Sequence, residues 1–96
     1  MIYATHKLYD CKQNVTIHMV VETQDSLVAK TYKFESEKHS MLWYDAIVLS
    51  SKKQKNYFFE TFDKVLEYLQ CNDDSHTLYA YGVTYDTDGC MLTQLK

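Results

Sequence analysis

The chain lacks proline and arginine altogether, and it has two glycines, Gly82 and Gly89, in 96 residues. Loops that cradle the phosphates of nucleotides need several closely spaced glycines, so this class of site is excluded. Arginine supplies the bidentate contacts by which proteins read guanine edges and grip phosphates. Its absence, together with a net charge of −3, argues against sequence-specific recognition of nucleic acid.

The same bias points to an origin. Codons for proline, glycine and most arginines are rich in G and C, whereas those for lysine, tyrosine and phenylalanine are rich in A and T. All ten basic residues are lysines, and there are nine tyrosines. We therefore hypothesise an AT-rich genome, such as that of many phages and mobile elements.

Cysteine is sparse, with Cys11, Cys71 and Cys90 far apart in the sequence. An odd number at wide spacing fits neither a disulfide framework nor a CxxC metal site, so we expect three reduced thiols. Residues 1–7 lack the pattern of a signal peptide, and no stretch approaches the ~18 apolar residues of a membrane span. These features predict a cytoplasmic protein.

The composition is that of an ordinary globular protein, with 46% hydrophobic and 24% charged residues. A chain of 96 residues has the common size of one domain. We therefore expect residues 1–96 to form a single domain with one core.

Period-2 alternation predicts several strands, and one segment has helical periodicity. The pattern favours an α+β fold in which an antiparallel sheet of about 6–7 strands, built from hairpins, carries one short amphipathic helix on one face. The expected strands are 2–9, 15–22, 27–35, 41–50, 78–85 and 90–95, with 56–59 as a short strand or the opening of the helix, and the expected helix is 62–70.

The helix has the clearest signal. Phe62, Val65, Leu66 and Leu69 recur at the spacing that puts them on one face. Thr61 precedes them and is a favourable N-cap residue, because its hydroxyl can accept from a free backbone N–H in the first turn.

Register within the first hairpin follows from burying the apolar residues of both strands together. That requirement sets even positions of strand 2–9 against odd positions of strand 15–22, and it puts His6 and His18 on opposite faces. A zinc site between these two histidines is therefore disfavoured. The expected core face is Ile2, Ala4, Leu8, Val15, Ile17, Met19 and Val21, and the expected other face is Tyr3, Thr5, Lys7, Tyr9, Thr16, His18 and Glu22.

Catalytic and metal motifs are missing. The Asp86-Thr87-Asp88-Gly89 stretch has half the acids of a calcium loop, and Asp-Gly is a strong hairpin-turn signal, so we interpret it as a turn. Cys71 and Cys90 lack the surroundings of a known nucleophile. We expect a non-enzymatic protein without metal or cofactor.

Tyrosine is the best functional lead, because its ring supplies apolar area while its hydroxyl prefers a wet end. Tyr79, Tyr81 and Tyr85 alternate on one face of strand 78–85, and Tyr3 and Tyr9 could join them. The sequence favours two interpretations equally: these rings form an open patch for a protein partner, or the helix covers them and they belong to the hydrophobic core.

Charge is the second lead. Residues 1–56 have a net charge of +2, while residues 57–96 have a net charge of −5. Such an acidic surface would suit a basic groove of a partner, for instance one that normally holds nucleic acid. The candidate partner-binding acids are Glu60, Asp63, Glu67, Asp73, Asp74, Asp86 and Asp88.

These leads favour a protein-binding inhibitor or regulator. In size, acidity and composition the chain resembles the small phage-encoded inhibitors of bacterial defence, including anti-CRISPR proteins, and also bacterial toxin-immunity proteins. The resemblance is one of general character, and it assigns no residue a role.

The alternative is a small nucleic-acid-binding domain that uses Lys52, Lys53 and Lys55 with stacked tyrosines. A third class, a cysteine-dependent enzyme, would depend on Cys71 or Cys90. A homodimer through an exposed edge such as strand 90–95 is also compatible with the sequence.

Overall fold

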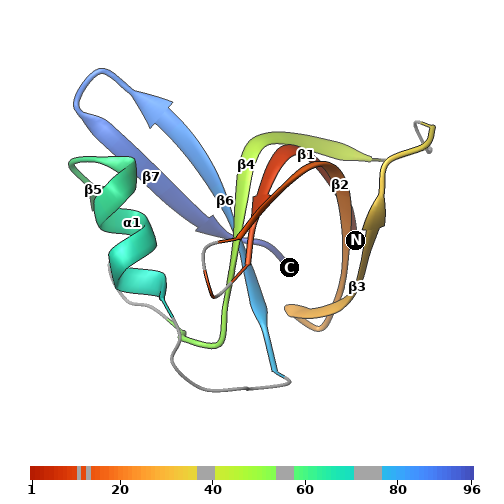
Figure 1. Cartoon of the computed structure of the whole chain (residues 1–96). Helices are drawn as coiled ribbons and strands as arrows, with labels where there is room; N and C mark the ends of the chain where they lie inside the picture. Colours follow the sequence, from red (N-terminus) through yellow and green to blue (C-terminus); the bar gives the residue numbers. More distant parts are fainter. Residues whose placement is uncertain (11, 13, 37–40, 54–57, 71–76) are drawn as a thin grey trace.

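The computed structural model describes residues 1–10, 12, 14–36, 41–53, 58–70 and 77–96 (Figure 1). It is a mostly β structure with one short helix. The elements in chain order are β1 (Ile2–Tyr9), β2 (Val15–Gln24), β3 (Leu27–Lys33), β4 (Leu42–Ser50), β5 (Phe58–Phe59), α1 (Phe62–Leu69), β6 (Tyr79–Asp86) and β7 (Gly89–Gln94).

All seven strands belong to one sheet in the order β3-β2-β1-β4-β6-β7-β5. The sheet is mixed, because β4 runs parallel to β1, with Tyr3 opposite Leu42 and Tyr9 opposite Val48. The expectation of a wholly antiparallel sheet was therefore wrong at this pair. After β3 the chain passes the β1–β2 hairpin and adds β4 on its far side, and alternation within a strand carries no information about such a crossing.

The sheet curls until β3 approaches β6. The backbone N–H of Val28 donates to the carbonyl of Leu78 just before β6, at 2.9 Å. One core cluster fills the inside of this curl. Its buried members are Tyr3, Leu8, Val21, Ile47, Leu49, Ala80 and Leu95.

A second cluster lies under the helix. Val65 and Leu69 of α1 pack against Tyr81 and Val83 of β6 and Leu92 of β7. The predicted helix at 62–70 is confirmed as Phe62–Leu69, with its apolar residues turned to the sheet. The helix covers the β5–β7–β6 side of the sheet (Figure 1).

The register of the first hairpin differs from the prediction. Ala4 lies opposite Val20, so even positions face even positions. Tyr3 is buried rather than solvent-facing, whereas Val15 and Ile17 are 51% and 60% exposed. Val15 and Ile17 lie in the part of β2 that extends past the end of β3, where the last paired residues are Met19 and Lys33.

The terminal strand is not an open edge along its full length. β7 pairs with β6 on one side, and on the other β5 covers Cys90 and Met91. The outermost strands of the sheet are β3 and β5. An edge-to-edge dimer would therefore use β3 or the uncovered part of β7.

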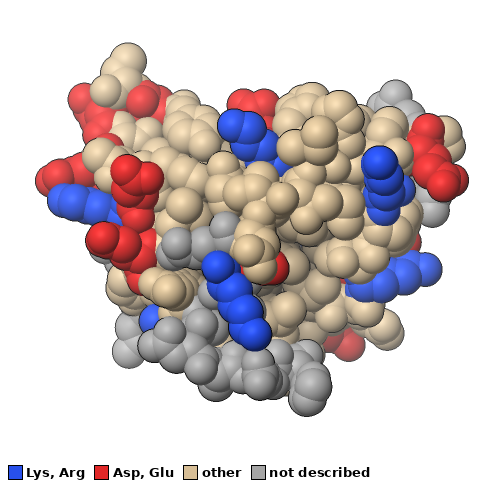
Figure 2. Space-filling model, in the orientation of Figure 1, with Lys and Arg blue, Asp and Glu red and all other residues tan. Residues whose placement is uncertain are grey.

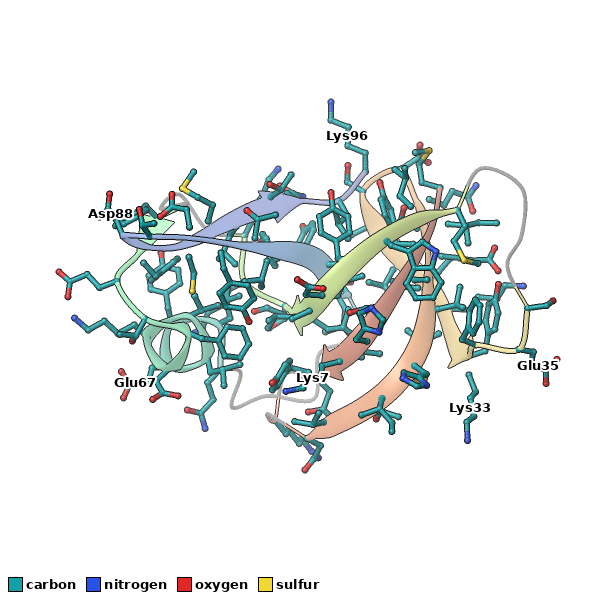
Figure 3. The ribbon with its side chains drawn as sticks, turned by 90° about the horizontal axis from the view of Figure 1, so that it is seen from above. Lys7, Lys33, Glu35, Glu67, Asp88 and Lys96 are labelled. Carbon is teal, nitrogen blue, oxygen red and sulfur yellow. The ribbon has the colours of Figure 1, made fainter. Side chains whose placement is uncertain are left out.

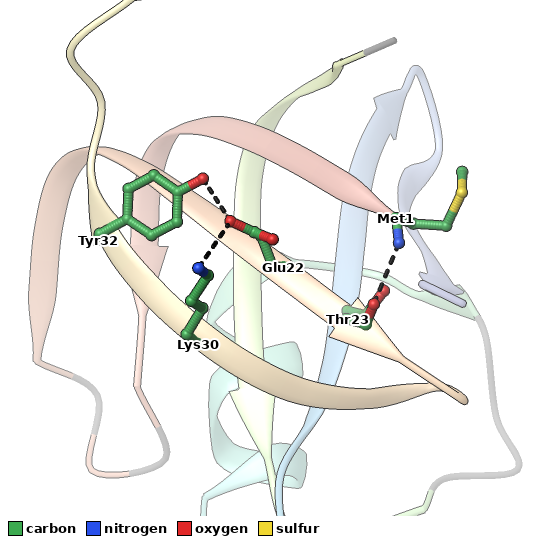
Figure 4. A network of polar contacts seen from close by, with 5 residues as sticks. All are labelled: Met1, Glu22, Thr23, Lys30 and Tyr32. Atoms are coloured by element: carbon green, nitrogen blue, oxygen red, sulfur yellow. Dashed lines mark hydrogen bonds and ion pairs between the residues drawn. The ribbon is translucent and has the colours of Figure 1, made fainter. Parts of the chain in front are cut away.

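Polar contacts secure the outer hairpin (Figure 4). The hydroxyl of Tyr32 donates to Glu22 at 2.5 Å, and the ammonium of Lys30 lies 3.6 Å from the same carboxylate. Beside them, the amino nitrogen of Met1 donates to the carbonyl of Thr23 at 3.1 Å. These contacts join β2 to β3 and to the start of β1.

No helix in the described part of the chain has the length and apolar character that crossing a membrane requires.

Candidate functional site

Most of the predicted acids gather at one end of the molecule. The pairing of Phe59 with Cys90 sets the start of α1 beside the β6–β7 turn, where Asp86 lies opposite Gly89. Figure 2 shows acidic side chains on the side where α1 and this turn lie. The exposed acids there are Glu60, Asp63, Glu67, Asp86 and Asp88, and the candidates Asp73 and Asp74 lie outside the described residues.

Lys64 lies among these acids. Its ammonium is 3.0 Å from the carboxylate of Glu60, one turn away across the helix N-terminus. Both side chains are largely exposed, so the pair neutralises one charge locally and contributes little to stability. The surface keeps an excess of negative charge.

The three candidate tyrosines of β6 divide between core and surface. Tyr81 is fully buried, and its hydroxyl donates to the carbonyl of Lys52 at 2.6 Å. Tyr79 is half-buried against the helix cluster. Tyr85 is 54% exposed. The helix therefore covers Tyr81, and Tyr85 remains available to a partner.

The two tyrosines of β1 do not add to an open patch. Tyr3 is buried, and its hydroxyl donates to the carbonyl of Lys96 at 3.1 Å. Tyr9 is half-buried, with its ring 4.9 Å from that of Phe62. The ring centroid of Phe62 in turn lies 6.1 Å from that of Tyr85, so the Tyr85 ring packs at the end of a row formed by Tyr9 and Phe62.

Other exposed apolar side chains accompany Tyr85. Phe58 and Met91 are cross-strand partners of β5 and β7, and the ring centroid of Tyr68 in α1 lies 5.4 Å from that of Phe59, with the two rings tilted by 55°. Phe58, Tyr68 and Met91 were not predicted from the sequence, because the pairing of β5 with β7 depends on a register that periodicity does not reveal. We use the name acidic end for the surface formed by Phe58, Glu60, Asp63, Glu67, Tyr68, Tyr85, Asp86, Asp88 and Met91.

A shallow cavity of about 360 Å³ lies on this surface, lined by Phe59, Lys64, Glu67 and Tyr68. It combines ring faces with a carboxylate and an ammonium, which suits a polar side chain of a partner better than a cofactor.

A second cavity, of about 320 Å³, lies between β4 and β6. It is lined by His6, by residues 43–45 of β4 and by residues 83–85 of β6. None of the β4 residues was predicted as a site. The available signal was Asp45, a lone acid within an otherwise apolar strand sequence.

His6 and His18 lie side by side, which corrects the expectation of opposite faces. Their ring centroids are 6.0 Å apart, and the Trp43 ring lies 5.5 Å from His6. The cause is the even-to-even register of β1 and β2. Within the part of the chain that the structure describes, no three His, Cys, Asp or Glu side chains are placed to hold a metal ion.

Cys90 is a buried residue of β7 and lies opposite Phe59 of β5. Burial raises the pKa of its thiol above the ordinary value, and Asp86 adds to the shift. A thiol with a raised pKa stays protonated at neutral pH and is a poor nucleophile. The candidate Cys71 lies outside the described residues.

We use the name lysine turn for the segment that holds Lys52, Lys53 and Lys55, and one of these lysines contacts another part of the protein. The ammonium of Lys52 donates to the carbonyl of Tyr68 at 3.2 Å, near the end of α1. Lys53 is exposed, and Lys55 lies outside the described residues.

Comparison with known protein families, with curated proteins and with solved structures finds no match to this chain.

Proposed function

We propose that the chain is a non-enzymatic protein-binding module, an inhibitor or regulator that docks its acidic end on a basic surface of a protein partner. The observation that carries this proposal is the joint presence of five exposed carboxylates and four exposed aromatic or methionine side chains on adjoining elements.

The two kinds of side chain have different roles in binding. Aromatic and methionine residues are enriched in the cores of protein interfaces, where they bury apolar area. Acids around them favour a partner of opposite charge and raise the rate of encounter. Phe58, Tyr68, Tyr85 and Met91 would supply the apolar contacts, and the acids around them would select the partner.

The elements behind this surface are firmly held. Val65 and Leu69 anchor α1 in the core, and the β6–β7 turn is closed by the Asp86 carboxylate, which accepts from the N–H of Asp88 at 2.7 Å. A surface fixed in advance loses less conformational entropy on binding. The partner's basic surface could be one that otherwise holds nucleic acid, in which case binding would inhibit the partner by occupying it.

The experiment is a tagged pull-down from a bacterial lysate treated with nuclease. The test variant carries Glu67→Gln and Asp88→Asn at the acidic end. The control carries Asp25→Asn, in the turn between β2 and β3, and Glu35→Gln, just after β3. These substitutions remove the same charge near the edge of the sheet formed by β3. All four side chains are exposed.

We expect the wild type and the control to retain a stoichiometric protein partner. The affinity of the test variant for that partner should be at least about tenfold lower, because removing one member of a charge pair at an interface has an effect of this size. Equal retention by both variants would contradict the role of the acidic end. Recovery of nuclease-sensitive nucleic acid alone would overturn the proposal and favour the lysine turn.

A further inference from the structure

The cavity between β4 and β6 arises from the way the sheet splits. The paired register of these strands ends at Ala46 and Val83. Beyond that point β4 continues beside β1, and β6 continues beside β7 to the pair of Asp86 and Gly89. Figure 1 shows β4 and β6 bending apart above their common stretch. The 320 Å³ cavity lies where they separate.

Three aromatic rings form its walls, and each is held by other parts of the protein. The Trp43 ring lies between those of His6 and Phe34, at 5.5 and 5.1 Å. The Tyr44 ring lies 6.0 Å from that of buried Tyr3. The Tyr85 ring packs against that of Phe62. These contacts hold the three rings in place before any ligand arrives.

One carboxylate lines the same cavity. Asp45 makes no hydrogen bond or ion pair with the other residues that the structure describes. It is close enough to Tyr85 to add to the burial effect that raises the pKa of that phenol. The Asp45 carboxylate would repel an anion in the cavity. A purely apolar ligand would remove water from this carboxylate without offering it a hydrogen bond or a charge, which costs free energy.

Aromatic faces around a carboxylate are the chemistry that recognises organic cations. The negative faces of tryptophan and tyrosine rings attract an ammonium or guanidinium group, and a nearby carboxylate balances the positive charge of that group. The volume is at the lower end of the range for small-molecule sites, which suits a single side chain rather than a folded segment.

We propose that this cavity binds one cationic side chain, a lysine or an arginine, of the protein partner. The proposal rests on the proposed function, since it names the group by which that partner would be anchored. Tyr85 and Asp86 connect the cavity to the acidic end, so one basic surface could cover both.

Trp43 is the sole tryptophan, so its fluorescence reports directly on the cavity. The wild type would be titrated with capped arginine, capped lysine and capped citrulline, the last being a neutral isostere of arginine. The variants are Asp45→Asn, which keeps the shape of the side chain, and Asp25→Asn, at an exposed position in the turn between β2 and β3, as a control.

We expect at least one cation to change the fluorescence saturably, with citrulline at least about tenfold weaker and Asp45→Asn weakening the cation by about tenfold. Asp25→Asn should bind like the wild type. An equal response to citrulline, no saturable response to either cation, or no effect of Asp45→Asn would overturn the cation site.

The two proposals fail separately. If the pull-down recovers a partner that depends on the acidic end while the titrations show no cation binding, the cavity proposal alone is wrong. If capped arginine or lysine binds through Asp45 but no protein partner is found, the cation site stands and the proposed function falls.

Discussion

Gly82 shows how one residue without a side chain shapes the cavity. A Cβ at this position would lie 2.5, 2.7 and 2.9 Å from three ring atoms of Tyr44. The ring of Tyr44 therefore rests directly on the backbone of β6, between that strand and Tyr3. In the sequence, Gly82 is merely a residue that weakens a strand. Its function in packing depends on Tyr44, which is distant along the chain.

Gly82→Ala should lower the free energy of unfolding by about 1–3 kcal/mol, because the Tyr44 ring must move out of a packed position. Urea denaturation measures the effect. In a Tyr44→Ala background the same substitution should cost little, since the clashing ring is gone. A full cost in both backgrounds would show that Tyr44 is not the cause.

Cys90 gives a second prediction for a single residue. Its raised pKa keeps the buried thiol protonated at neutral pH. Alkylation followed by mass spectrometry should show Cys90 reacting at least about tenfold more slowly in the native protein than in the denatured chain. Because the unfolded thiol ionises first, stability should fall as the pH rises above the ordinary value of 9.0. Equal rates in the two states would contradict its burial.

The helix α1 is too short to be stable alone, and contacts at both ends support it. The hydroxyl of Thr61 accepts from the N–H of Lys64 at 3.3 Å. At the other end the buried hydroxyl of Ser50 donates to the carbonyl of Leu69 at 2.8 Å and accepts from the N–H of Lys52 at 3.0 Å. Ser50 thus ties the end of β4 to the end of α1.

Ser50→Ala should lower the free energy of unfolding by about 1–3 kcal/mol, since it removes two hydrogen bonds at a buried position. Ser36→Ala, at an exposed position, should stay within about 0.5 kcal/mol of the wild type. Thermal or urea denaturation of both variants checks the difference. If the two variants were equally stable, the support that Ser50 gives to the helix would be disproved.

Local elements could be predicted from the sequence because their determinants are close together along the chain. Helical spacing and the Thr61 cap identify α1, and Asp86 to Gly89 form the predicted turn. The parallel pairing of β1 with β4 and the register of β1 with β2 could not be predicted. Both depend on which strands meet, and a change in register moves side chains such as His18 to another face.

At the scale of the whole molecule, the charge asymmetry of the sequence persists in the fold. Residues 57–96 hold the acidic excess, and they supply both α1 and the β6–β7 turn, which are neighbours in the structure. Figure 3 shows Glu67 and Asp88 at one end and Lys33 at the other. The acidic end could thus be anticipated, whereas the cavity with Trp43 and Asp45 depends on where β4 and β6 separate.

Hydrogen–deuterium exchange can locate the surface on which a protein partner binds. It would be measured on the chain alone and on its complex with the partner recovered by pull-down. Binding at the acidic end should slow exchange in Phe62–Leu69 and in the turn between β6 and β7, and it should leave exchange in β2 and β3 unchanged. Protection confined to β2 and β3, with none at the acidic end, would contradict it.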